Sequence, residues 1–185
     1  MYERLAKLAI LGGCGLRVVT SITSFFINTF DHDHGYYEAT SISFVNILWI
    51  LLGVVGNLAI IGGFALLFLL RPNLVDLAMG GAFALALFQS LLDIVLIKYL
   101  AVSMHQYAII SVIIGLIYIT ALLLWAFKMK KTGKPLAAVA IFAAVILSYG
   151  GSFLNVLTGG TILYSLGNIA AQCGLAFAAY IDYNS

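Results

Sequence analysis

The chain has 185 residues, of which 63% are hydrophobic and only 9% are charged, with a formal net charge of +2. Soluble domains average about 45–50% apolar and about 25% charged residues, so these few charges cannot cover a water-facing surface. The composition excludes a conventional soluble enzyme, a nucleic-acid-binding protein with a basic face, and a disordered tail. It favours a protein whose partner is the lipid bilayer, because apolar side chains can then face lipid.

Six apolar stretches follow one another along the chain, and each is long enough to cross a bilayer as a helix of about 20 residues. None shows the short alternating pattern of a membrane strand, and a continuous helix satisfies its own backbone hydrogen bonds in lipid. We therefore predict an all-α polytopic membrane protein, a six-transmembrane-helix bundle that forms a single domain over residues 1–185. The predicted spans cover residues about 5–29, 42–70, 74–99, 106–127, 136–157 and 161–181.

Cations cluster at alternate ends of the predicted spans. Lys and Arg accumulate in cytoplasmic loops, so an N-terminus placed inside leaves seven of the nine cations in the cytoplasm. We therefore predict that both termini are cytoplasmic. Aromatic residues near the same boundary, among them Tyr2, Trp125 and Tyr180, are typical of an interfacial belt. The seven cations are Arg4, Lys7, Arg71, Lys128, Lys130, Lys131 and Lys134.

Two opposite charges lie deep within the predicted spans, Arg17 in the first and Asp93 in the third. A charge at the bilayer centre costs from about 3 to over 10 kcal/mol, so such residues are functional candidates. One interpretation is a buried ion pair that determines how the first and third helices pack. The other is a binding site, in which Arg17 neutralises an anionic or carbonyl-bearing ligand and Asp93 is a proton or cation site.

Polar side chains on the other spans predict an outward-facing cavity around these charges. The fourth span is the least polar, and we predict that it lies against lipid. Glycine pairs such as Gly12-Gly13 and Gly62-Gly63 predict close contacts between helices. The residues predicted to bind a small molecule or ion in this cavity are Arg17, Asn57, Gln89, Asp93, Asn168 and Gln172.

The longest predicted outer connection carries Asp31-His32-Asp33-His34, with Glu38 close behind. Imidazole and carboxylate groups together suit Zn²⁺ or another divalent transition metal. Three interpretations compete, namely a solvated polar loop, a pH-sensing histidine cluster and a metal site. The predicted metal ligands are His32, His34 and, on the same outer face, His105.

Common catalytic motifs are absent from the sequence, which has no H-E-x-x-H, G-x-S-x-G, P-loop or strand-to-helix G-x-G-x-x-G. No serine within a span has a histidine near it in sequence to act as a base. The sequence therefore favours a protein that is not an enzyme and indicates no cofactor beyond a divalent metal. The outer histidines leave metal-dependent chemistry open.

Four short segments resemble a family of bacterial integral membrane proteins with six to seven spans, catalogued as a domain of unknown function. They are the basic start Glu3-Arg4-Leu5-Ala6-Lys7, the turn Leu69-Leu70-Arg71-Pro72-Asn73, the hairpin Lys130-Lys131-Thr132-Gly133-Lys134-Pro135 and the last span around Leu166-Gly167-Asn168-Ile169-Ala170. The resemblance implies a multi-pass protein of a prokaryotic plasma membrane. It supplies no activity and no site residues.

Three functions fit the sequence. The first is a small transporter, channel or solute-binding membrane subunit with the outward-facing polar cavity. The second is an accessory or assembly subunit, whose glycine-rich faces dock onto partner membrane subunits of a larger complex. The third is a membrane sensor, or a metal-dependent membrane enzyme that uses the outer histidine loop.

Overall fold

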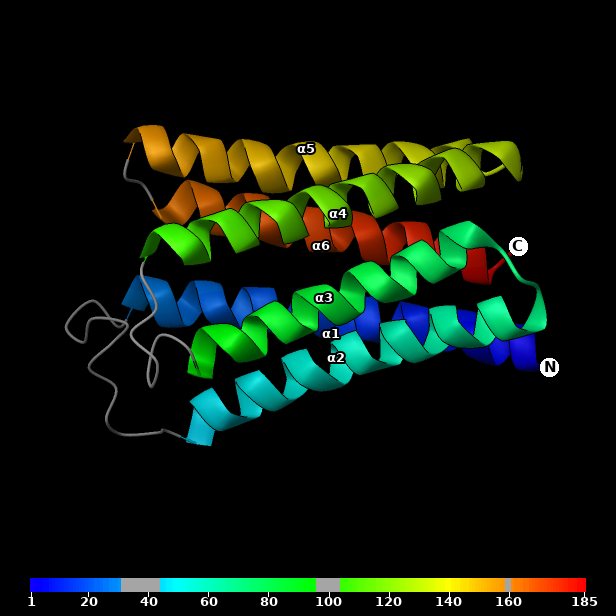
Figure 1. Cartoon of the computed structure of the whole chain (residues 1–185), viewed down its shortest axis with the longest axis horizontal. Helices are drawn as coiled ribbons and strands as arrows, with labels where there is room; N and C mark the ends of the chain where they lie inside the picture. Colours follow the sequence, from blue (N-terminus) through cyan, green and yellow to red (C-terminus); the bar gives the residue numbers. More distant parts are fainter. Residues whose placement is uncertain (31–43, 96–103, 159–160) are drawn as a thin grey trace.

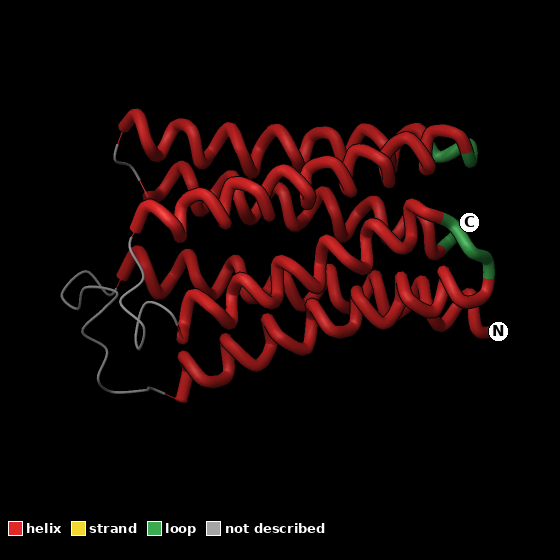
Figure 2. Tube along the Cα trace, viewed as in Figure 1, coloured by secondary structure: helices red, strands yellow, loops and turns green. Residues whose placement is uncertain are grey.

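A computed structural model describes the backbone of residues 1–30, 44–95, 104–158 and 161–185, and most side chains within these ranges. The side chains of residues 27–30, 44–49, 92–95, 104–109, 152, 154–158 and 161 lie outside the description. The described chain is helical apart from short turns, which confirms the all-α prediction (Figures 1 and 2). The helices are α1 (Tyr2–Phe30), α2 (Phe44–Leu70), α3 (Leu74–Val95), α4 (Met104–Lys131), α5 (Pro135–Thr158) and α6 (Thr161–Tyr183).

Five of these helices are long and apolar enough to cross a membrane over their described residues. In α5 the described apolar segment, Pro135–Gly151, is shorter, although the helix itself has 24 residues. Large apolar side chains cover the outside of the bundle, for example Leu58 at 53%, Val112 at 60% and Ile146 at 70% exposure. Such an exterior suits lipid rather than water. The chain is therefore a multi-pass membrane protein.

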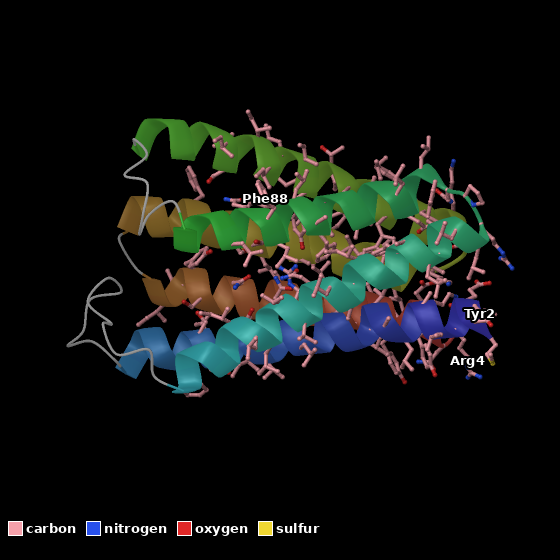
Figure 3. The ribbon with its side chains drawn as sticks, turned by 60° about the horizontal axis from the view of Figure 1, so that its bottom comes forward. Tyr2, Arg4 and Phe88 are labelled. Carbon is pink, nitrogen blue, oxygen red and sulfur yellow. The ribbon has the colours of Figure 1, made fainter. Side chains whose placement is uncertain are left out.

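The six helices run alternately up and down and form a ring. Each helix packs against the next one in the chain, and α1 also packs against α6. Both chain termini and the α2–α3 and α4–α5 turns lie at one end, which we call the terminal end (Figure 1). Arg4 and Tyr2 lie at this end (Figure 3). We call the opposite end of the bundle the distal end.

The two turns at the terminal end follow directly from their residues. Asn73 accepts a hydrogen bond from the Val75 amide at 2.9 Å and so caps the start of α3. Gly133 has φ of +78° and closes α4 in a Schellman motif, because its amide bonds the Lys130 carbonyl and the next amide bonds that of Met129. Pro135 then begins α5, at the position where a helix has no use for an amide hydrogen.

Glycines bring neighbouring helices into backbone contact. A Cβ at Gly13 would lie 2.5 Å from the carbonyl oxygen of Gly56, and one at Gly63 would lie 2.7 Å from that of Ala6. These contacts join α1 to α2, whereas Gly12 and Gly62 have nothing within 4 Å. Gly13 and Gly63 therefore make the close helix contacts predicted from sequence, and their neighbours Gly12 and Gly62 do not.

Aromatic and apolar side chains fill the half of the ring nearer the terminal end. Phe64 of α2 meets Trp125 of α4 edge to face, with ring centroids 5.6 Å apart, and Met79 and Ile141 are fully buried beside them. Trp125, predicted near the cytoplasmic boundary, is only 2% exposed, so its ring packs in the core and does not face lipid. A ring of helices needs bulky side chains to fill its centre, and α4 supplies the largest one.

Candidate functional site

Arg17 lies near the middle of α1 and donates a hydrogen bond to Asn57 Oδ1 of α2 at 3.0 Å. Asn57 in turn donates from Nδ2 to the Gly53 carbonyl of its own helix at 3.0 Å. That second bond orients the amide so that its oxygen faces the guanidinium. Gly56 lets the two helices approach at this depth, since a Cβ there would lie 3.1 Å from the Gly13 carbonyl oxygen and 3.1 Å from Cβ of Leu16.

An aromatic face completes the described surroundings of the guanidinium. The Arg17 Cζ lies 5.0 Å from the ring centroid of Phe83 on α3, a cation–π distance. Phe83 packs edge to face on Tyr118 of α4 at 5.3 Å. The Tyr118 hydroxyl is close enough to Arg17 to interact electrostatically, without a hydrogen bond of good geometry between them. Three other helices therefore surround one cation.

Arg17 has no carboxylate partner among the side chains that the structure describes. A hydrogen bond from a charged group contributes about 1.5–3 kcal/mol, and a desolvated cation–π contact about 2 kcal/mol. Together they offset only part of the larger estimates for a charge at the bilayer centre. The described partners are thus polar or polarisable but carry no negative charge.

A second polar group joins α6 to α1. Gln172 is only 6% exposed, and its Nε2 donates to Asn168 Oδ1 at 3.4 Å. Asn168 Nδ2 donates to Ser21 Oγ, also at 3.4 Å and one turn from Arg17 on α1. These long contacts place two predicted binding residues of α6 beside the Arg17 helix. We call Arg17, Ser21, Asn57, Tyr118, Asn168 and Gln172 the central polar cluster.

The remaining predicted site residues are partly separate from this cluster. Gln89 donates to Ser111 Oγ of α4 at 2.9 Å, nearer the distal end. Asp93 belongs to α3 and His105 to α4, but both side chains lie outside the described residues, as do His32 and His34. Within the described ranges, no three His, Cys, Asp or Glu residues come together as a metal site. The Arg17–Asp93 pair and the histidine site therefore stay predictions.

The prediction that α4 lies against lipid fits one face of this helix, where Val112 is exposed. On the other face Leu122 and Trp125 belong to the core and Tyr118 packs against it. Sequence reasoning missed Phe83 and Tyr118 as neighbours of Arg17, because an aromatic residue in an apolar helix gives no sign of which face it occupies. A tyrosine near the middle of a predicted span was the available signal, since a buried phenol usually finds a polar partner.

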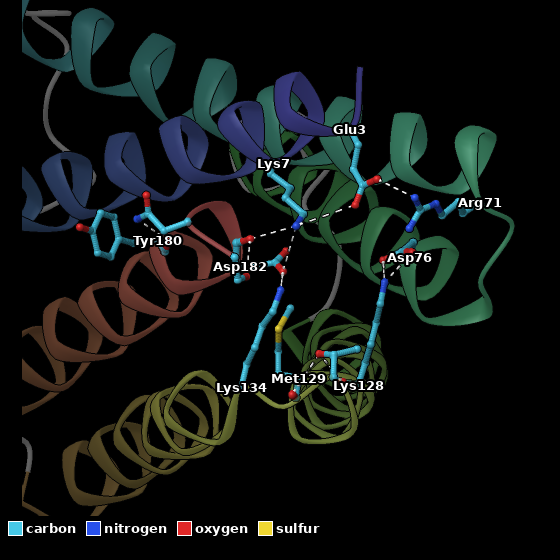
Figure 4. A network of polar contacts seen from close by, with 12 residues as sticks. Glu3, Lys7, Arg71, Asp76, Lys128, Met129, Lys134, Tyr180 and Asp182 are labelled. Atoms are coloured by element: carbon cyan, nitrogen blue, oxygen red, sulfur yellow. Dashed lines mark hydrogen bonds and ion pairs between the residues drawn. The ribbon is translucent and has the colours of Figure 1, made fainter. Parts of the chain in front are cut away.

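The terminal end is closed by ion pairs (Figure 4). Asp182, near the end of α6, pairs with Lys134 and with Lys7. The Nζ of Lys7 lies 3.6 Å from the carboxylate of Asp182 and 3.0 Å from the main-chain oxygen of Asp182. Asp76 of α3 is 3% exposed and pairs with Lys128 of α4 at 2.5 and 2.7 Å. The Asp182 contacts join α6 to α1 and to the α4–α5 turn, and the Asp76–Lys128 pair joins α3 to α4.

More exposed cations occupy the rim of the same end. Arg71 pairs with Glu3 at 3.2 Å although its side chain is 82% exposed. The Arg4 guanidinium lies 5.6 Å from the Tyr183 ring centroid, and Lys130 and Lys131 are exposed. The cations predicted to lie in the cytoplasm are therefore of two kinds. Some form ion pairs that join helices, and others are exposed at the rim.

Comparison with protein-family models, with curated proteins and with solved structures finds no match for this chain. The resemblance to the bacterial six- to seven-span family stays a prediction that these comparisons do not test.

Proposed function

We propose that this protein binds a small anionic or carbonyl-bearing solute at Arg17, as a transporter or as the solute-binding subunit of a transport system. The observation that carries the proposal is the cation itself. Arg17 has an amide and an aromatic ring as described partners and no described carboxylate. A guanidinium in that setting is a donor fork suited to a carboxylate, a phosphate or a carbonyl group.

The distribution of polarity along the ring supports a direction of entry. On the terminal side of Arg17, buried Phe64, Met79 and Trp125 fill the core, and the Asp182 and Asp76 ion pairs lie beyond them. Polar pairs such as Asn168–Ser21 and Gln89–Ser111 instead lie level with Arg17 or nearer the distal end. A polar solute therefore reaches Arg17 from the distal end.

The charges at the two ends support an orientation in the membrane. Seven of the nine cations belong to the helix ends and turns at the terminal end, namely Arg4, Lys7, Arg71, Lys128, Lys130, Lys131 and Lys134. Cytoplasmic loops carry such an excess of Lys and Arg, so we assign the terminal end and both chain termini to the cytoplasm. The distal end then faces the outside, and the protein captures its solute from there.

Native mass spectrometry of the protein, gently extracted from its own membrane, tests this function. We expect a small bound molecule on the wild-type protein that is absent from Arg17→Gln and retained by Arg17→Lys. Lys131→Gln is the matched control, because it removes one exposed cation at the terminal end and should keep the molecule bound. Wild-type protein without any bound molecule, or equal occupancy in Arg17→Gln, would contradict the proposal.

An accessory subunit of a larger complex is the alternative. Some glycines contact helices of the same chain, as Gly13 does with Gly56 and Gly167 with the Leu147 carbonyl, whereas Gly12 and Gly62 have nothing within 4 Å and leave a small-residue surface for a partner. The same mass spectrum would reveal a partner chain directly.

A further inference from the structure

Two buried polar atoms in the described part of the ring have no hydrogen-bond partner, namely the hydroxyl oxygen of Tyr118 and Oε1 of Gln172. Both side chains line the same small cavity, between α4, α5 and α6. An unpaired buried polar atom costs about 1–3 kcal/mol, and two of them around one space point to a common partner. Neither atom belongs to the Arg17–Asn57 contact on which the proposed function rests.

The size of the cavity limits what that partner is. The space open to the centre of a water molecule is about 10 Å³, and a buried site needs about that much to hold one water. A metabolite or a lipid headgroup is far too large for this space. A water also needs two to four polar partners, and the cavity walls include Ser148 and Tyr149 of α5 as well.

We propose that one ordered water binds in this cavity and joins α4, α5 and α6. The water accepts a hydrogen bond from the Tyr118 hydroxyl and donates one to Gln172 Oε1. Its second hydrogen goes to the Tyr149 oxygen, whose own proton is already donated to the Gly115 carbonyl at 3.2 Å. Every buried polar atom of the cavity that lacked a partner then has one.

The water also closes a gap in the central polar cluster. From Gln172 the described contacts continue through Asn168 to Ser21 on α1, and Tyr118 lies beside Arg17. With its proton directed to the water, the Tyr118 oxygen presents its lone pairs to the guanidinium. The water is therefore a positioning element for the polar centre of the ring, independent of whether a solute binds there.

Replacing Tyr118 by Phe in the full-length protein tests whether the hydroxyl has a hydrogen-bond partner, because a partnered and an unpartnered hydroxyl predict opposite signs. Tyr118→Phe keeps the ring that packs on Phe83 and removes only the hydroxyl. If water occupies the site, the thermal unfolding midpoint of the detergent-solubilised protein falls. If the hydroxyl is unpartnered, its removal raises the midpoint or leaves it unchanged, and the proposal fails. Tyr180→Phe, on an exposed side chain of α6, is the control and should not shift the midpoint.

A double-mutant cycle with Gln172→Met separates the water from a direct Tyr118–Arg17 bond. A shared water makes the two losses less than additive, since either change alone already breaks the bridge. Strictly additive shifts would overturn the proposal. Should Gln172→Met fail to fold, a structure of the wild-type protein that resolves ordered water decides the question. Density within hydrogen-bond reach of both atoms supports the proposal, and its absence refutes it.

Discussion

Adjacent glycines in α1 should respond oppositely to the same substitution, and this difference tests the helix ring directly. In Gly13→Ala the new Cβ would lie 2.5 Å from the Gly56 carbonyl oxygen and 2.6 Å from Cγ1 of Ile60, where ordinary contacts lie at 3.4–4 Å. The backbone of α2 cannot rotate out of the way as a side chain can. Helices α1 and α2 would have to separate by about 1 Å for normal van der Waals contact.

The expected cost follows from overpacking. Extra methyl groups in a well-packed core cost about 1–3 kcal/mol, and the better helix propensity of alanine returns at most about 1 kcal/mol. We therefore expect Gly13→Ala to lower the free energy of unfolding by about 1–2 kcal/mol. Gly12→Ala meets nothing within 4 Å, so it should be neutral or stabilising by up to about 1 kcal/mol.

Thermal and denaturant unfolding of both variants in the same detergent, followed by far-UV circular dichroism, measures this difference. Equal stability of the two variants would refute the α1–α2 packing described above. A Gly12→Ala variant less stable than Gly13→Ala would show that the wrong face of α1 has been assigned to the ring interior.

Two further predictions concern the charges. Asp76→Asn leaves Lys128 without its carboxylate in a partly buried site and should lower the free energy of unfolding by roughly 3 kcal/mol. The double variant Asp76→Asn with Lys128→Met should recover part of that loss. A negligible effect of Asp76→Asn on the unfolding midpoint would mean that the pair is fully solvated. If Arg17 binds a solute, Arg17→Gln and Asp93→Asn should each alter the stability of the protein independently. The double variant should then be no more stable than the less stable of the two single variants. Restored stability in the double variant would instead identify a structural ion pair, and the proposed solute site would lose its main support.

Much of the helical architecture could be predicted from residue order. The stretches 42–70 and 136–157 differ from α2 and α5 by no more than two residues at either end, because lipid thickness and helix rise set the length of an apolar segment. The end of α4 is equally local, since Gly133 adopts a positive φ and Pro135 begins the next helix. The partial burial of Arg17 beside Asn57 also follows from the cost of exposing a charge to lipid.

Residue order therefore predicts six helices and a cation within the first of them, although α4 runs four residues beyond its predicted end at 127. The partners of that cation depended on the tertiary structure. A helical period tells which residues share a face, but it does not tell which neighbour that face meets. Asn57, Phe83 and Tyr118 meet around Arg17 because this side chain contacts its neighbour α2 and also reaches α3 and α4 inside the ring. The tertiary structure likewise decides that Trp125 packs into the core instead of facing lipid, because the centre of the ring has to be filled.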